Sequence, residues 1–180
     1  IVEQVAALKE MVNAFSDYAR SPDMEIVTIN IAILLREIID LYQEQESKIN
    51  ITFNIDSDDL ECDADPGRIR QIIHNLVRNS IEAIPEDIAG KISVSVKKRD
   101  INNIKMIEIC IEDNGSGFDK NSLGQIFDPY VTSKSKGTGL GLAIVKKLVE
   151  EHMGFIEAEN AKKQGAVIKI FMPENEEMRE

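Results

Sequence analysis

The sequence predicts a two-layer α/β sandwich, in which helices cover one face of a mixed sheet, preceded by one further helix. Two observations lead to this expectation. Segments in which apolar residues alternate with period two recur along the chain, and longer segments between them carry apolar residues at helical spacing. The length of 180 residues suits one domain with a short appendage. We therefore expect three parts: a helical stem over residues 1–22, the domain over residues 23–174 and a frayed tail over residues 175–180.

The composition limits the partners of this domain. Asp and Glu outnumber Lys and Arg by 32 to 21, and the net charge of -11 argues against binding to nucleic acid or to an anionic membrane surface. No segment resembles a signal peptide or a membrane span, and we expect a cytoplasmic location with no direct membrane contact. Cys62 and Cys110 lie in apolar, strand-like segments, which indicates buried thiols in a reducing compartment; a disulfide is the alternative.

The first twenty residues have the apolar repeat of a coiled coil. Apolar residues recur at alternating spacings of four and three, and a Ser-Pro pair at 21–22 ends the pattern. These residues are Ile1, Val5, Leu8, Val12, Phe15 and Ala19. We expect one helix of a dimeric stem; a helix that packs on its own domain is the alternative. Because the chain begins at Ile1, without a Met and inside this pattern, we expect it to be part of a longer protein.

The next segments predict a first α/β unit. Residues 24–29 have a strand pattern, and Asn30 is a suitable N-cap for a helix over residues 31–46. Residues 49–55 alternate cleanly and predict a second strand. After a turn, residues 60–62 predict a short third strand.

Asp65 and Pro66 predict the start of the next helix, because Asp is a favourable N-cap and Pro suits the first helical position. The helix is expected to end at Ile84, before a proline. One face is apolar, and the polar face carries Gln71, Asn75, Arg78, Asn79 and Glu82. Asparagine has a poor helix propensity, and Asn75 and Asn79 lie one turn apart. This face is therefore a candidate site; a solvated face is the alternative.

The second half of the sequence predicts two hairpins, a loop and a helix. Residues 118–136 are mostly polar, and a segment of that length within a compact domain is usually functional or disordered. Glycines within residues 137–141 open a helix, which we expect to end at Gly154 as its C′ residue. The strands of the two hairpins are expected over residues 91–99, 104–111, 155–159 and 166–172.

Two glycine clusters carry the candidate site. In the first, Asp113 follows a strand and lies beside backbone that a ligand can approach closely, at Gly115 and Gly117. The second opens a helix, whose free N–H groups and dipole suit phosphate. Its glycines are Gly137, Gly139 and Gly141. We expect a nucleotide between the clusters, with its base near Asp113; ordinary turns are the alternative, and the dinucleotide-binding and P-loop patterns are absent.

The order of these segments resembles the catalytic ATP-binding domain of sensor histidine kinases. The segments that resemble the N, G1, F and G2 boxes of that family are residues 74–80, 113–117, 127–130 and 137–141. Residues 15–22 and 65–71 are similar to the nitrogen-regulation branch of these kinases. The resemblance covers nearly the whole chain, and it implies the Bergerat, or histidine-kinase-type ATPase, fold.

The resemblance also implies roles for individual residues. Asp113 would accept a hydrogen bond from the adenine amino group, which selects against guanine. Asn79 would bind Mg²⁺, whose other ligands are water and the phosphates of ATP. Residues 118–136 would form the ATP lid, with Lys134 as a candidate phosphate contact. The other residues implied to contact the nucleotide are Asn75, Arg78, Gly115, Gly117, Gly137, Thr138, Gly139, Leu140 and Gly141.

In the family that the chain resembles, the phosphoryl group passes to a histidine on a dimeric stem and then to an aspartate in the receiver domain of a response regulator. The two histidines here, His74 and His152, lie in nothing that resembles an H box. We therefore expect the acceptor upstream of Ile1 in the parent protein, a homodimer through the stem, and a chain that binds Mg-ATP without phosphorylating itself.

Three other functions are weighed against this one. ATP-driven clamps of the gyrase, Hsp90 and MutL type resemble this fold, but they activate water with a glutamate one helical turn before the metal-binding Asn. Here that position is Asn75, which cannot act as a base. A non-catalytic dimerisation module is the second alternative, although nothing in the boxes looks degraded. An anti-sigma-type serine kinase shares the boxes, but the N-terminal heptads fit a two-component stem better.

Overall fold

The computed structural model describes residue 12 and residues 23–46, 48–57, 59–132 and 137–175. The predicted stem, apart from Val12, lies outside these residues, as do Lys134 and the tail beyond residue 175, so the division into three parts stays a prediction. The elements in chain order are β1 (Val27–Asn30), α2 (Ile31–Gln45), β2 (Ile49–Ile55), β3 (Glu61–Ala64), α3 (Pro66–Ala83), β4 (Gly90–Ile101), β5 (Ile104–Asp113), the short 3₁₀ helix η1 (Leu123–Gln125), α4 (Gly141–Glu151), β6 (Phe155–Asn160) and β7 (Ala166–Pro173).

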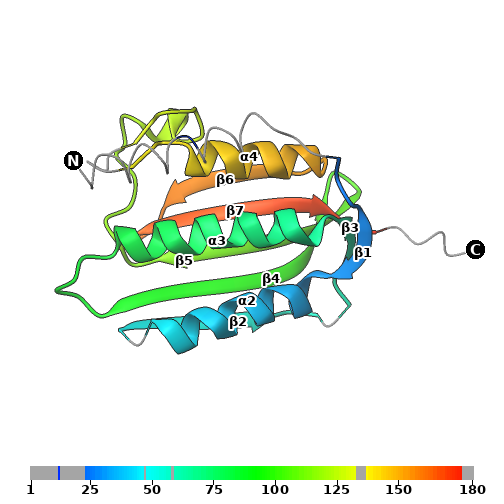
Figure 1. Ribbon diagram of the computed structural model, residues 1–180, viewed down its shortest axis with the longest axis horizontal. Helices are drawn as coiled ribbons and strands as arrows, with labels where there is room; N and C mark the ends of the chain where they lie inside the picture. The colour runs from blue at the N-terminus through cyan, green and yellow to red at the C-terminus, as the bar shows by residue number, and fades with distance from the viewer. Residues whose placement is uncertain (1–11, 13–22, 47, 58, 133–136, 176–180) are drawn as a thin grey trace, which may run out of the picture.

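Five strands form the main sheet, in the order β2-β4-β5-β7-β6. The pair β2–β4 is parallel and the other three pairs are antiparallel, so the sheet is mixed, as expected. The helices α2, α3 and α4 lie side by side on one face of this sheet (Figure 1). The predicted two-layer arrangement is therefore confirmed.

The core lies between the helices and the sheet. Alternate residues of the central strands point into it, as the period of a strand requires, and α3 contributes an apolar face at helical spacing. Among its members are Ile92, Val94, Ile107, Ile109, Ile168 and Ile170 from the strands and Ile69, Ile73 and Leu76 from α3. Full burial of one such side chain stabilises the fold by about 1.5–3 kcal/mol. This face of α3 holds the helix in place, so that its other face is free to carry the polar residues.

A second, two-stranded sheet pairs β1 with β3 in the antiparallel direction. Both strands differ from the prediction, which placed them at residues 24–29 and 60–62. The reason is their pairing: Val27 lies opposite Ala64, and the next residue, Asp65, is already the N-cap of α3. Residues 24–26 therefore have no strand to pair with, whereas β3 extends to meet β1.

The caps of α2 and α3 agree with the sequence. The side chain of Asn30 accepts hydrogen bonds from the backbone N–H groups of Ala32 and Ile33. The side chain of Asp65 does the same for Gly67 and Arg68, with Pro66 as the first helical residue. Each cap satisfies two N–H groups that the helix itself leaves without a partner.

The end of α4 differs from the prediction. The left-handed residue after the C-cap His152 is Met153, with φ 57°, and not Gly154. The N–H of Gly154 bonds the carbonyl of Val149, and the N–H of Met153 bonds that of Glu150, which is the Schellman pattern with Met153 at C′. Gly154 is required for another reason, because a Cβ there would lie 2.4 Å from the carbonyl oxygen of Phe171.

Both cysteines are free thiols, as expected, but only Cys62 is buried. Cys110 is partly exposed because it points to the face of β5 opposite the helices, whereas its neighbours Ile109 and Ile111 point into the core. None of the described helices is long and apolar enough to cross a membrane.

Candidate functional site

The two asparagines of α3 face the start of α4. A Cβ on Gly141, the first residue of α4, would lie 3.6 Å from Nδ2 of Asn79 and 3.7 Å from Oδ1 of Asn75. The Nδ2 group of Asn75 donates to the carbonyl of Gln71 on its own helix. The structure thus brings the two asparagines of α3 together with Gly141 of the second glycine cluster.

Arg78 contacts a different part of the molecule. Its side chain is 66% exposed and lies 3.6 Å from Glu82 on the same helix. Burial raises the pKa of Tyr42 on α2, and the positive charge of Arg78 acts in the opposite direction. The described contacts of Arg78 therefore do not join it to Gly141, and its contact with a nucleotide stays a prediction.

Asp113 is the last residue of β5, and its side chain is buried. Its Oδ1 atom accepts two backbone hydrogen bonds, from Gly115 at 2.8 Å and from Ala166 at 3.2 Å. Within the described part of the chain, Oδ2 makes no hydrogen bond. One oxygen therefore fixes the carboxylate, and the other is left to meet a ligand.

The loop after Asp113 packs on the end of α3. The N–H of Ser116 donates to the carbonyl of Ala83 at 3.0 Å, and a Cβ on Gly115 would lie 2.6 Å from the same oxygen. Ala83 lies one helical turn after Asn79, a rise of about 6 Å. The loop that follows Asp113 therefore contacts α3 about one helical turn beyond Asn79.

The second glycine cluster is bent sharply before α4. Gly139 has φ 67°, and its carbonyl accepts the N–H of Tyr130, so Tyr130 is tied to the cluster. Thr138 Oγ1 accepts the N–H of Leu140 at 3.3 Å. The helix begins only at Gly141, and its N-cap Leu140 offers no side-chain hydrogen bond. The first N–H groups of α4 therefore have no capping side chain, as a phosphate site requires.

Two further asparagines hold the Asp113 loop, and sequence reasoning missed both. The amide of Asn114 accepts the N–H of Lys91, which lies within β4, and donates to the carbonyl of Ala89, just before β4. The amide of Asn160 accepts the N–H of Phe118 and donates to its carbonyl. The sequence does contain a signal for Asn160. Ile156 and Ala158 of β6 point toward the core, and Asn160 is a polar residue at the next position of this alternation, where an apolar residue is expected.

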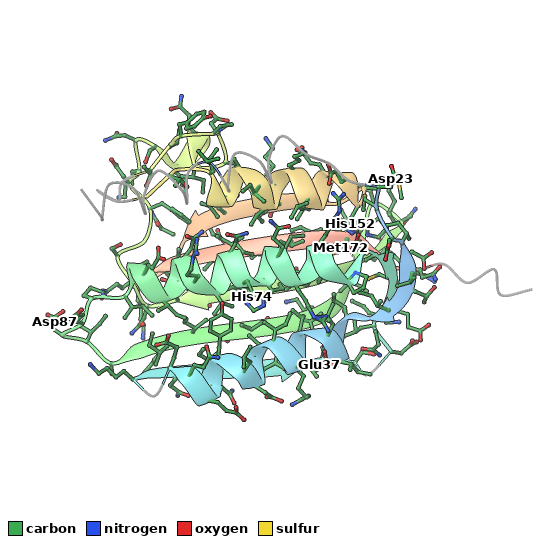
Figure 2. The ribbon with its side chains drawn as sticks, viewed as in Figure 1. Asp23, Glu37, His74, Asp87, His152 and Met172 are labelled. Carbon is green, nitrogen blue, oxygen red and sulfur yellow. The ribbon has the colours of Figure 1, made fainter. Side chains whose placement is uncertain are left out.

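The two histidines are engaged in contacts between elements. His74 Nδ1 lies 3.0 Å from the hydroxyl of Tyr42, and burial, followed by the charge of Arg70, lowers the pKa of His74. His152 is buried; its Nδ1 donates to the carbonyl of Leu148, so Nε2 accepts the N–H of Asp65 at 3.1 Å. Figure 2 shows His74 on α3 and His152 at the end of α4, where α4 meets the start of α3.

Residues 64–176 match the family of histidine kinase-, DNA gyrase B- and HSP90-like ATPases. Among curated proteins, the chain is 34% identical over 172 residues to an NtrY-like sensor histidine kinase of Rickettsia felis; the match covers 94% of this chain and 28% of the relative. The chain thus spans just over a quarter of that relative's length.

Two solved structures of the histidine kinase ThkA are similar. Its catalytic domain is 34% identical, with a TM-score of 0.73, over 84% of this chain and 97% of that chain. The structure of ThkA in complex with the response regulator protein TrrA is 29% identical, with a TM-score of 0.80, over 99% of this chain and 50% of that chain.

Proposed function

Since the chain belongs to the family of histidine kinase-, DNA gyrase B- and HSP90-like ATPases and is the ATP-binding catalytic domain of a sensor histidine kinase, we propose that it holds Mg-ATP between the Asp113 loop and the start of α4. In the whole protein it presents the γ-phosphoryl group to a histidine on a helical stem. The observation that carries the proposal is Asp113, a buried carboxylate with one oxygen fixed by two N–H groups and the other without a described partner.

Asp113 recognises the adenine ring. Its Oδ2 accepts a hydrogen bond from the exocyclic amino group. A base with a carbonyl oxygen at that position places an acceptor against an acceptor, so ATP is preferred over inosine or guanosine triphosphate. A hydrogen bond to a charged group contributes about 1.5–3 kcal/mol, which corresponds to roughly 10- to 100-fold in affinity.

The test is the ratio of the dissociation constants of ATP and inosine triphosphate, measured by calorimetry on the chain and on D113N. Asparagine keeps an oxygen for the N–H groups of Gly115 and Ala166 and puts an NH₂ group in place of Oδ2. We expect the wild-type preference for ATP, about 10- to 100-fold, to disappear in D113N. The control is E112Q, because Glu112 is the adjacent carboxylate but is exposed, and it should keep the preference.

Equal binding of the two nucleotides by the unmodified chain would contradict adenine recognition by Asp113. So would a D113N variant that discriminates as well as E112Q does.

The donor groups on α3 fit Mg²⁺ held together with a nucleotide. Within the described residues, no three or more His, Cys, Asp or Glu side chains gather to hold a metal ion. Mg²⁺ keeps several waters and takes phosphate oxygens, so one amide oxygen suffices as protein ligand. Asn79, which faces the start of α4 where phosphates are expected, would supply it. The ion would neutralise phosphate charge, while the glycines of residues 137–141 would donate backbone N–H groups.

Asn79 should therefore determine how strongly ATP binding depends on Mg²⁺. We expect the affinity of the wild type for ATP to fall when Mg²⁺ is removed with EDTA, and N79A to bind ATP with nearly the same affinity in both conditions. N54A is a matched control, since Asn54 is an exposed asparagine on β2. A Mg²⁺ dependence that survives in N79A would rule out this ligand.

The acceptor of the phosphoryl group and the response regulator belong to the whole protein. The support for both is the similarity to sensor histidine kinases, one of which is solved in complex with a response regulator protein. The position one turn before Asn79 is Asn75, whose Nδ2 donates to Gln71, and an amide cannot take a proton from water. Transfer to a histidine is therefore favoured over steady hydrolysis of the clamp type.

A further inference from the structure

Asn160 is the last residue of the edge strand β6, and its amide makes a closed pair of hydrogen bonds with one residue. Its Oδ1 accepts the N–H of Phe118 at 2.6 Å, and its Nδ2 donates to the carbonyl of Phe118 at 2.9 Å. A β-strand partner would occupy the N–H and the carbonyl of Phe118 in the same way. The amide therefore takes the place of a strand that is absent here, and both ends of the amide are needed.

The approach of Asn160 explains Gly117. Gly117 has φ 72°, and a Cβ there would lie 2.7 Å from Oδ1 of Asn160. Phe118 packs partly against the core, so the amide fixes the point at which the chain leaves the sheet and enters the segment 118–136. Phe118, the first residue of that segment, is thus tied to β6.

The β6–β7 hairpin, to which Asn160 belongs, also holds Asp113. Ala166, which lies opposite Asn160 in the β6–β7 register, donates its N–H to Oδ1 of Asp113. Gly165, with φ 109°, lies so close that a Cβ would overlap the carbonyl oxygen of Asp113, at 1.8 Å. One end of the β6–β7 hairpin therefore holds both ends of the loop 113–118: Ala166 at Asp113 and Asn160 at Phe118.

We propose that Asn160 is a positioning residue for adenine recognition: it fixes the loop 113–118 from its Phe118 end, so that Oδ2 of Asp113 is aimed at the base. Asn160 does not itself touch the nucleotide. This inference rests on the proposed function, in which Asp113 recognises the adenine amino group.

Two variants separate the two ends of the amide. N160A removes both hydrogen bonds. N160D keeps an oxygen for the N–H of Phe118 but turns the second end into an acceptor that faces the carbonyl of Phe118. We expect both variants to bind ATP about tenfold more weakly than the wild type, with N160D at least as weak as N160A. N54A serves again as the matched control and should bind as the wild type does.

The decisive measurement is the ratio of ATP to inosine triphosphate affinity. If Asn160 aims Asp113, both variants lose affinity for ATP but little for inosine triphosphate, so the ratio falls. If Asn160 only stabilises the fold, both affinities fall together and the ratio is unchanged, which would overturn the inference. If the wild type shows no preference for ATP, the proposed function itself is contradicted. If the preference is lost in D113N but kept in N160A and N160D, only the role of Asn160 is contradicted.

A second measurement needs no nucleotide. Lys120 is exposed and lies two residues after Phe118, so trypsin cleavage can report on how firmly Phe118 is held. We expect cleavage after Lys120 to be several-fold faster in N160A and N160D than in N54A, at a temperature at which all variants are folded. Equal cleavage rates would overturn the role of Asn160 as the anchor of Phe118.

Discussion

Glu108 is a carboxylate buried on the sheet face opposite the helices. It lies on β5 between Ile107 and Ile109, which both belong to the core, so its side chain points the other way. Its side chain is 4% exposed, and it is bonded by Arg99 Nε at 2.7 Å and Lys97 Nζ at 3.1 Å, both on the neighbouring strand β4. Burial alone would raise the pKa of Glu108, but these hydrogen bonds and charges lower it below its ordinary value.

This pair of contacts should make stability depend on pH. Because the pKa of Glu108 is lower in the folded state, its contribution is present above the ordinary pKa of a glutamate and is lost as the pH falls through the folded value. E108Q should lower the free energy of unfolding by about 1–3 kcal/mol at pH 7. The loss should shrink below about pH 4, as urea unfolding at several pH values would reveal. E112Q, on the same strand and face but exposed, should show no such difference.

The end of α4 carries strain that one substitution can relieve. Met153 is left-handed, with φ 57°, and the residue is 82% exposed, so removal of its side chain loses little packing. A non-glycine residue in this conformation costs about 1 kcal/mol. M153G should therefore raise the free energy of unfolding by about 0.5–1 kcal/mol, and the melting temperature by a few degrees.

M153A is the control for this substitution. Alanine keeps the Cβ that causes the strain, so M153A should melt near the wild type. If M153A gained as much as M153G, the gain would come from loss of the exposed Met side chain and not from the backbone.

Local elements were predictable because their signals are local. Asp65 and Pro66 mark the start of α3 by themselves, and the turn of the β4–β5 hairpin uses two left-handed residues, Asn102 and Asn103, a type that tolerates this conformation. The polar face of α3 was also visible, because Asn75 and Asn79 are unusual inside a helix.

Contacts between distant segments were not predictable in this way. Asn160 and Asn114 bond backbone groups 42 and 25 residues away, and the sequence around each asparagine does not indicate these partners. The same holds for β1, whose ends are set by pairing with β3. At the site, the sequence indicated Asp113 and Gly115, but it did not indicate that Ala166 holds the carboxylate of Asp113 or that Asn114 and Asn160 hold its loop.

On the scale of the whole chain, we expect neither histidine to accept a phosphoryl group, since both are engaged in contacts between elements. His152 is buried with both ring nitrogens bonded, and Nδ1 of His74 is paired with Tyr42. We expect no acid-labile label when the 180-residue chain is incubated with γ-labelled Mg-ATP. A label that survives alkali and disappears in acid would contradict this, and the variants H74A and H152A would locate it.

The strand β7 lies between β5 and β6, although it follows both in the chain. A nascent chain that has left the ribosome only as far as β6 therefore has an open β5 edge, and Asp113 lacks the N–H of Ala166. Translation must reach residues 166–173 before the central sheet can close. We therefore expect nucleotide binding only after β7 has been synthesised, and a chain stalled before it to expose a strand edge of the kind that promotes aggregation.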